Sequence, residues 1–203
     1  LKKADPECTI ILVEPLVKIH AATNHENVQE LNEPQFQAMD IIAGRICPEL
    51  GGSEDFLEIL GFNYYWNCQW SGNGESLEWP DYQQLRVPFS ELLQTAYNRY
   101  KKPIILTETG HFGDRRAEWL EEITVQCALA RRNGVDLRGI CIYPVTDRPD
   151  WDDLTSYSQC GIFDLDENCN RIPNQHYINA LIKSQNSFKE KKYRIHHLME
   201  FFR

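Results

Sequence analysis

Short apolar runs alternate along the chain with longer segments in which apolar residues recur at helical spacing. Four runs predict buried strands, because a strand covered on both faces is continuously apolar rather than alternating. These runs are residues 9–13, 59–62, 104–107 and 139–142. The segments between them predict helices over residues 33–47, 89–100 and 118–133, and the last ends at an Asn133-Gly134 stop signal.

Alternation of strands and helices predicts an α/β protein with a parallel sheet and right-handed crossovers. Four such units make half of a TIM-type (β/α)8 barrel, which has roughly 250 residues when complete. An open doubly wound sheet is the alternative, but no strand is followed by a glycine-rich phosphate loop. Nucleotide binding is therefore unsupported, and a half barrel is the predicted fold.

Two strand-like runs end at a carboxylate. Residues 104–107 are followed by Glu108, Thr109 and Gly110, and residues 9–13 are followed by Glu14. In α/β barrels the carboxyl ends of the strands carry the catalytic side chains. A glutamate at such an end is about as often a loop anchor as a catalyst, so Glu108 and Glu14 are candidates on position alone.

Aromatic residues gather after the strand-like runs rather than inside them. Flat rings at a barrel mouth suit sugars, whose C–H faces are apolar while their hydroxyl groups need polar partners. The alternative is that these rings cap the core. The residues are Tyr64, Tyr65, Trp66, Trp70, Tyr143 and Trp151, and His20 and His111 also follow strand ends.

Composition and charge limit the classes of partner. With 203 residues, 42% of them hydrophobic, the chain can form one domain with a substantial core. Its net charge of −9 disfavours nucleic acid and anionic membranes as partners. Seven cysteines are scattered without a C-x-x-C pair or a histidine cluster at zinc spacing, so we expect no metal site and a reducing, cytoplasmic setting.

The two ends of the sequence differ from the middle. The chain opens with Leu1 and two lysines, shows neither a signal-peptide pattern nor an apolar stretch of ~18 residues, and suggests a soluble piece of a longer protein. Residues 182–203 carry six basic and two acidic side chains. We expect residues 1–181 to form the half barrel and residues 182–203 a solvated basic helix or tail, with a binding arm as the alternative.

Three motifs resemble, in order and spacing, those of family 1 glycoside hydrolases of the β-glucosidase type. They are Gly61-Phe62-Asn63-Tyr64-Tyr65, Thr107-Glu108-Thr109-Gly110, and Tyr143 to Trp151 followed by Gly161-Ile162-Phe163-Asp164. The resemblance implies a (β/α)8 barrel that hydrolyses β-glycosides with retention, using two glutamates and no cofactor. It also implies that this chain is the C-terminal half of the barrel, strands five to eight.

The resemblance assigns roles to individual residues. Glu108 matches the nucleophile, Tyr65 matches the tyrosine that hydrogen-bonds it, and Asn63 belongs to the same polar network. Asp150 and Trp151 match a Glu-Trp pair that grips the non-reducing sugar. Thr109, Tyr143-Pro144 and Arg148 depart from the commonest family pattern, so a preference among sugars cannot be transferred.

The second catalytic carboxyl of the family lies in an Asn-Glu-Pro motif that ends the fourth strand, which we expect upstream of Leu1. Asn32-Glu33-Pro34 spells that motif, but no apolar strand precedes it. We predict instead a helix start, with Asn32 as the N-cap. Glu14 is expected to contact ligand rather than to act as the acid/base.

A function from a different class is a non-catalytic carbohydrate-binding or structural half barrel. A half barrel leaves two sheet edges and an apolar interior open. We therefore expect the chain to pair with a missing half or with itself, and the isolated chain to lack normal glycosidase turnover.

Overall fold

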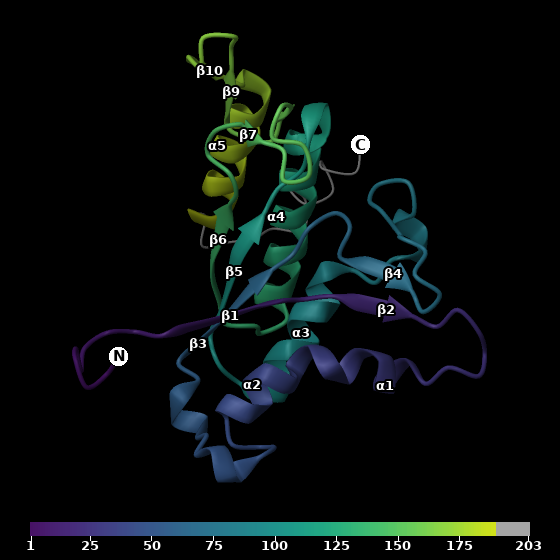
Figure 1. Ribbon diagram of the computed structural model, residues 1–203, viewed down its shortest axis with the longest axis vertical. Helices are drawn as coiled ribbons and strands as arrows, with labels where there is room; N and C mark the ends of the chain where they lie inside the picture. Colours follow the sequence, from purple (N-terminus) through teal and green to yellow (C-terminus); the bar gives the residue numbers. More distant parts are fainter. Residues whose placement is uncertain (190–203) are drawn as a thin grey trace.

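The computed structural model describes residues 1–189, and four parallel strands form its main sheet (Figure 1). Their order is β1-β3-β5-β6, so strands that follow one another along the chain lie side by side. Their bounds are Ile11–Pro15, Ile59–Asn63, Ile104–Thr109 and Leu137–Ile142. All four predicted strands are confirmed, with some ends shifted by up to two residues.

The sheet does not close into a barrel. Within the described residues β1 and β6 are its outer strands, and each pairs with one neighbour. The strands lie in chain order and pack against helices on one face, as in part of a TIM-type barrel, whereas a doubly wound sheet carries helices on both faces. The predicted fold class is thus confirmed as a partial barrel.

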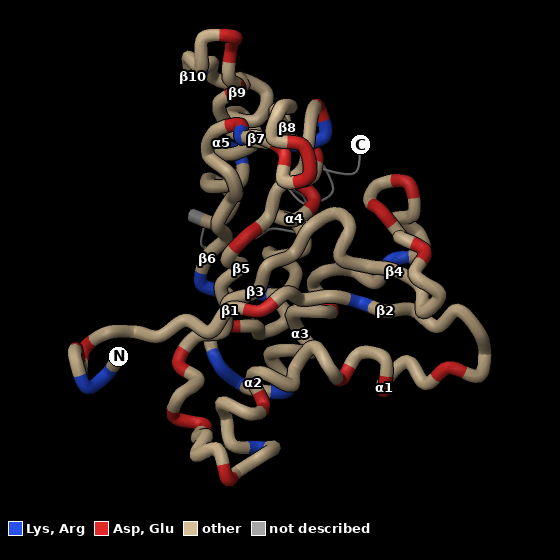
Figure 2. Tube along the Cα trace, viewed as in Figure 1, with Lys and Arg blue, Asp and Glu red and all other residues tan. Residues whose placement is uncertain are grey.

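Three longer helices follow the strands and pack together behind the sheet. α3 spans Phe89–Tyr100, α4 spans Arg116–Arg132 and α5 spans Gln175–Lys189. The bounds of α3 agree with the prediction, and α4 ends before Gly134, whose φ of +93° is the left-handed conformation that stops a helix. Acidic residues are spread over several helices and the loops between the elements (Figure 2), in keeping with the negative net charge.

The core lies between the sheet and the helices. Leu60, Phe62, Ile104 and Leu106 of the strands are buried against Leu93 of α3 and Trp119 and Ile123 of α4.

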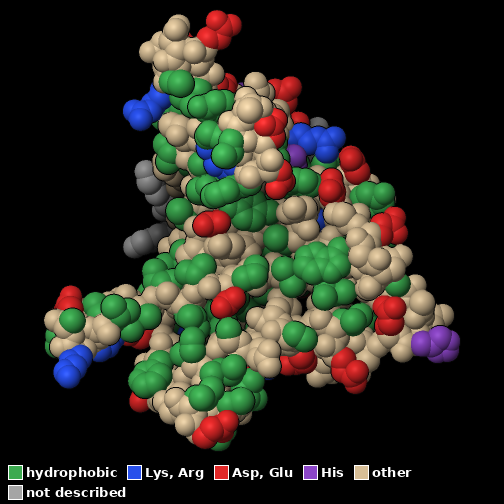
Figure 3. Space-filling view, viewed as in Figure 1, with side chains coloured by type: hydrophobic (Ala, Val, Ile, Leu, Met, Phe, Trp, Pro, Cys, Tyr) green, Lys and Arg blue, Asp and Glu red, His purple; other side chains and the backbone are tan. Residues whose placement is uncertain are grey.

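The alternate residues of the strands face the other, open side, where Ile11 and Val13 are 42% and 43% exposed. A side chain on Gly61 would meet both of them, which shows that they converge on that side. Figure 3 shows hydrophobic side chains across this open face.

The segment predicted as one helix over residues 33–47 is divided, and that prediction is wrong in extent. The structure has α1 at Val28–Asn32, a 3₁₀ turn at Glu33–Phe36 and α2 at Gln37–Ile42. Asn27, not Asn32, caps the first helix by accepting from Gln29 N. The Asn32 side-chain amide instead makes two hydrogen bonds to the backbone of Ile19. Its Oδ1 accepts from Ile19 N at 2.9 Å, and its Nδ2 donates to Ile19 O at 2.8 Å. A tertiary contact to a strand therefore takes the side chain that was expected to cap.

Shorter elements complete the chain. β2 (Lys18–His20) pairs with β4 (Gln69–Ser71), and two antiparallel pairs follow β6: β7 (Arg148–Pro149) with β8 (Tyr157–Ser158), and β9 (Phe163–Leu165) with β10 (Arg171–Pro173). Further 3₁₀ turns lie at Pro48–Leu50, Glu54–Phe56, Gln83–Leu85 and Gly113–Arg115.

The expected basic tail begins inside a helix. α5 runs continuously across residues 181 and 182, and residues 190–203 lie outside the described part of the chain. Among the described residues, no helix has both the length and the apolar character that a bilayer crossing requires.

Candidate active site

Glu108 and Tyr65 meet at the carboxyl ends of two neighbouring strands. Glu108 lies near the end of β5, and Tyr65 follows β3 by two residues. The Tyr65 hydroxyl donates to Glu108 Oε2 at 2.9 Å, and Tyr64 N donates to the Glu108 carbonyl at 3.0 Å. Burial raises the pKa of Tyr65, and the bond to Glu108 and its charge raise it further. The phenol therefore stays protonated and is a fixed hydrogen-bond donor to the carboxylate.

Asn63 stands beside Glu108 in the sheet. The two residues are register partners, after a local irregularity between Phe62 and Asn63. The Asn63 side-chain oxygen accepts from the Thr107 hydroxyl at 2.7 Å. Asn63 thus fixes the residue that precedes Glu108, and among the described residues it makes no direct bond to the Glu108 carboxylate.

A cavity of about 360 Å³ opens in front of Glu108. Rings make up much of its wall, and the Trp66 and His111 rings lie 5.0 Å apart between centroids. Glu108 is the one carboxylate among the described lining residues. The full set is Tyr65, Trp66, Glu108, Gly110, His111, Phe112, Tyr143, Pro144, Arg148, Trp151 and Cys160.

The aromatic residues that follow β3 divide between the cavity and the core. Tyr65 and Trp66 line the cavity, whereas Tyr64 is buried, stacks on Phe89 at 4.1 Å and accepts from Gln69 and Arg86. Tyr64 therefore caps the core, as the alternative interpretation of these rings expected.

Gly110 brings two strand ends together. A Cβ at this position would lie 2.2 Å from the carbonyl oxygen of Tyr143, which follows β6. Tyr143 N also donates to Thr109 O at 2.9 Å. The glycine is thus required for close approach of two backbones, rather than for the sharp turn that its position after a strand suggests.

A buried ionic cluster holds the loop that carries Arg148 and Trp151. Asp147 Oδ1 accepts from Cys160 N and Gly161 N, both at 2.9 Å. Arg116 Nη1 donates to Asp164 Oδ1 and to Gly161 O, both at 2.7 Å. Arg116 and Asp147 are buried. No role was predicted for either residue, because pairing between a helix and a distant loop leaves no local pattern.

Asp150 and Trp151 take different positions in that loop. The Asp150 carboxylate accepts from Asp152 N at 2.9 Å and Ser158 Oγ at 2.7 Å, and these bonds lower its pKa. Asp150 does not line the cavity. Trp151 does, although it is 75% exposed, and the Arg148 guanidinium carbon lies 4.9 Å from its ring centroid.

The structure keeps the other two candidate carboxylates out of the cavity. Glu14 is in register with Phe62, a core residue, and alternates with the open-face residues Ile11 and Val13. Glu33 pairs with Arg99 at 2.9 Å, at the end of α3 that leads into the amino end of β5. Glu108 lies at the carboxyl ends of the strands, so Glu33 lies near the opposite, amino ends of the strands.

Phe112 and Cys160 also line the cavity, and neither was a candidate from the sequence. Phe112 follows His111 directly, and Cys160 enters from the loop anchored by Asp147. His111 Nδ1 accepts from Phe112 N at 2.7 Å, and burial lowers the pKa of His111. The sequence signal for His111 and Phe112 was their position shortly after the end of β5.

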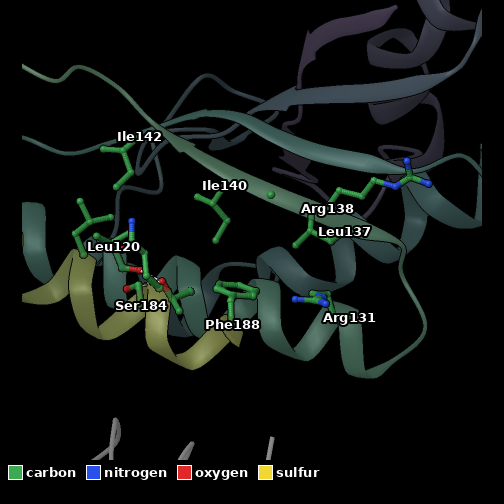
Figure 4. Close-up of a pocket in the computed structure, with 12 residues that line it drawn as sticks. Leu120, Arg131, Leu137, Arg138, Ile140, Ile142, Ser184 and Phe188 are labelled. Atoms are coloured by element: carbon green, nitrogen blue, oxygen red, sulfur yellow. Dashed lines mark hydrogen bonds between the residues drawn. The ribbon is translucent and has the colours of Figure 1, made fainter. Parts of the chain in front are cut away.

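A second cavity, of about 510 Å³, lies between β6 and helices α4 and α5 (Figure 4). Its wall is largely apolar, and Ile140 and Ile142 of β6 face Leu120 and Phe188 across it. It lies on the helix side of the outer strand. Among the described residues no group of three or more histidine, cysteine, aspartate or glutamate side chains could hold a metal ion.

Comparison with known proteins gives the fold but no family by sequence. No family model and no curated protein matches the chain. Among solved structures it is similar to a family 1 β-glucosidase from Thermotoga maritima, with TM-score 0.65 and 16% identity, over 90% of this chain and 52% of that one. The same enzyme in complex with azafagomine gives TM-score 0.66 at 16% identity, with the same coverage.

A hyperthermophilic β-glucosidase mutant gives TM-score 0.62 at 18% identity, over 85% of this chain and 42% of that one. The chain thus spans about half the length of the first two structures and less of the third. At this identity the likeness establishes a partial barrel of the kind found in glycoside hydrolases.

Proposed function

We propose that this chain supplies the nucleophile of a retaining glycoside hydrolase acting on β-glycosides, with Glu108 in that role. The hydrogen bond from Tyr65 to Glu108, 2.9 Å long and at the mouth of a ring-lined cavity, carries the proposal. A protonated phenol favours the ionised form of a neighbouring carboxylate and orients its free oxygen. That free oxygen is the atom that attacks.

The reaction is a double displacement. Glu108 attacks the anomeric carbon and forms a covalent glycosyl-enzyme as the leaving group departs, and water then releases the sugar. A second carboxyl, about 5 to 5.5 Å from the nucleophile, must protonate the leaving group and then activate water. The cavity lining of the described residues holds one carboxylate, so the acid/base comes from another part of a longer protein. No metal or organic cofactor takes part in these steps.

The remaining candidates have supporting roles. Asn63 fixes Thr107 beside the nucleophile, Trp151 offers a ring face to the sugar, and Asp150 orients the loop that carries Trp151. Glu14 contacts ligand only if pairing with the other half of the barrel turns the carboxyl end of β1 so that this side chain enters the cavity. The open edges at β1 and β6 are the sites where that half, or a second copy, would pair. Seven free thiols fit a reducing, cytoplasmic setting.

The proposal is tested on a longer protein that includes this chain and the barrel half that precedes it. We expect hydrolysis of an aryl β-glycoside, loss of hydrolysis in Glu108→Gln, and a fall of roughly 10- to 100-fold in Tyr65→Phe, the value of a hydrogen bond to a charged group. Glu33→Gln is the matched control, because Glu33 pairs with Arg99 near the amino ends of the strands, away from the cavity. Full activity in Glu108→Gln would refute the assignment.

A non-catalytic carbohydrate-binding half barrel is the second candidate function. The described residues place one carboxylate in the cavity lining, and this favours the binding function for the chain on its own. Under this alternative a sugar binds the chain with similar affinity in wild type and in Glu108→Gln, and the longer protein shows no turnover. Calorimetric titration beside the activity assay separates the two functions.

A further inference from the structure

Arg148 places a permanent positive charge in the cavity that holds Glu108. It lies in β7 and lines the cavity beside Trp151. Within the described part of the chain, no carboxylate lies at ion-pair distance from its guanidinium. The chain carries a net charge of −9, so a cation with no carboxylate partner in the described part of the chain is a specific feature of the site.

The guanidinium is held in place but only partly hydrogen-bonded. Nη1 donates to Pro149 O at 2.8 Å, and the group lies over the Trp151 ring, 4.9 Å from its centroid. Its Nε is buried and has no acceptor among the described residues. A cation stacked on an indole is oriented by the ring, while its N–H groups, which lie in the guanidinium plane, stay free to donate.

Arg116, in the same region, has a structural role, and its hydrogen-bond partners can be compared with those of Arg148. Its Nε donates to Gly113 O at 2.7 Å, and its Nη1 donates to Gly161 O and pairs with Asp164. It is buried and does not line the cavity. Within residues 1–189, Arg148 has one backbone acceptor, no carboxylate partner and a place in the cavity wall, so packing of the loop does not account for its charge.

Among the described residues, the acidic groups nearby accept hydrogen bonds from other donors and form no ion pair with Arg148. Glu108 lines the same cavity, and Tyr65 donates to its Oε2. The Asp150 carboxylate accepts from Asp152 N and Ser158 Oγ, which are the main causes of its lowered pKa, and the charge of Arg148 lowers that pKa further. A neutral sugar hydroxyl could accept from Arg148, but only an anionic oxygen would also balance its charge.

We infer that the cavity takes a glycoside that carries an anionic substituent, a carboxylate or a phosphate, and that Arg148 recognises this substituent. The guanidinium donates to the anionic oxygens through its in-plane N–H groups, and the Trp151 ring holds it in that orientation. This inference rests on the proposed function, because it assumes that the cavity in front of Glu108 holds a sugar.

Calorimetric titration of the longer protein that includes this chain tests the inference with three matched ligands: a neutral β-glucoside, the corresponding β-glucuronide, and the β-glucoside phosphorylated on its primary hydroxyl. We expect one of the two charged ligands to bind about tenfold or more tightly than the neutral one, as a charge-assisted hydrogen bond implies. The charged ligand that is preferred identifies the substituent. Arg148→Gln should remove the preference, and Arg148→Lys should keep part of it. Arg138→Gln is the control, because Arg138 is exposed and pairs with Asp136 outside this cavity.

Each outcome gives a distinct answer. Equal binding of neutral and charged sugars, unchanged in Arg148→Gln, overturns the inference and leaves the proposed function standing. If no sugar binds but inorganic phosphate binds wild type and not Arg148→Gln, the anion site stands and the proposed function is refuted. If neither sugar nor phosphate binds, both are refuted. Far-ultraviolet circular dichroism of each variant checks folding, and Arg148→Lys retains the charge if Arg148→Gln does not fold.

Discussion

Asp147 should be among the most sensitive positions for stability, because one carboxylate ties the cavity loop to the barrel. Its Oδ1 accepts from Cys160 N and Gly161 N at 2.9 Å, and its Oδ2 accepts from Leu165 N at 3.3 Å. The first two donors are buried with it. Arg116 lies 3.8 Å from Oδ1 and keeps its own pair with Asp164. Asp147→Ala therefore leaves backbone donors unpaired without leaving an unpaired arginine.

The expected loss follows from those donors. Each buried N–H left without an acceptor costs about 1–3 kcal/mol, so the Cys160 and Gly161 amides together cost about 2–6 kcal/mol of unfolding free energy. The Leu165 bond is longer and only partly buried, and it adds little. Asp147→Asn keeps a carbonyl oxygen that can accept from both amides, so it should cost about 1–2 kcal/mol, the loss of charge assistance alone.

Urea unfolding followed by tryptophan fluorescence measures these differences. Asp153→Ala is the matched control in the same loop: Asp153 bonds only to nearby exposed groups, and its replacement should stay within about 0.5 kcal/mol of wild type. A loss below about 1 kcal/mol in Asp147→Ala would show that the loop is not anchored in this way.

Three further predictions concern packing and titration. Gly110→Ala should destabilise by about 1–3 kcal/mol or more, because its Cβ would meet a backbone oxygen, whereas Gly139→Ala on β6 meets nothing and should be near neutral by urea unfolding. Burial alone would raise the pKa of Asp40, but hydrogen bonds from Arg99 and Tyr100 outweigh it and lower the pKa below 3.8. The stabilisation from Asp40 is then complete above the unfolded pKa and is lost as pH falls through the lower folded value, so the urea midpoint should fall more steeply below about pH 4 in wild type than in Asp40→Asn. Burial raises the pKa of Cys127, so a thiol reagent should reach it only in denaturant, whereas the exposed thiols react in native protein; these are Cys47, Cys141 and Cys169.

The strands and the ends of α3 and α4 could be predicted because their signals are local. A continuous apolar run marks a strand buried on both faces, and Gly134 ends α4 through its own backbone conformation. The prediction for residues 33–47 failed because Asn32 bonds to Ile19, thirteen residues away, instead of capping. Local pattern carries no information about such a contact.

The site could be predicted in part for the same reason. The positions of Glu108 and Tyr65 at two strand ends follow from the sequence, but which ring after β3 enters the cavity does not. Tyr64 and Tyr65 are adjacent and point to opposite sides, and the core takes the first. The positions of Arg116 and Asp147 depend on a helix and a loop meeting in space, which no spacing along the chain reveals.

The most direct test of the central claim is covalent labelling of Glu108. A fluorosugar with a leaving group acidic enough to depart without protonation forms the glycosyl-enzyme without help from the acid/base and traps it. Peptide mass spectrometry of the longer protein after incubation should find one sugar on the peptide that contains Glu108, and none in Glu108→Gln. A label on another carboxylate, or no label on a protein that binds the sugar, would contradict the account.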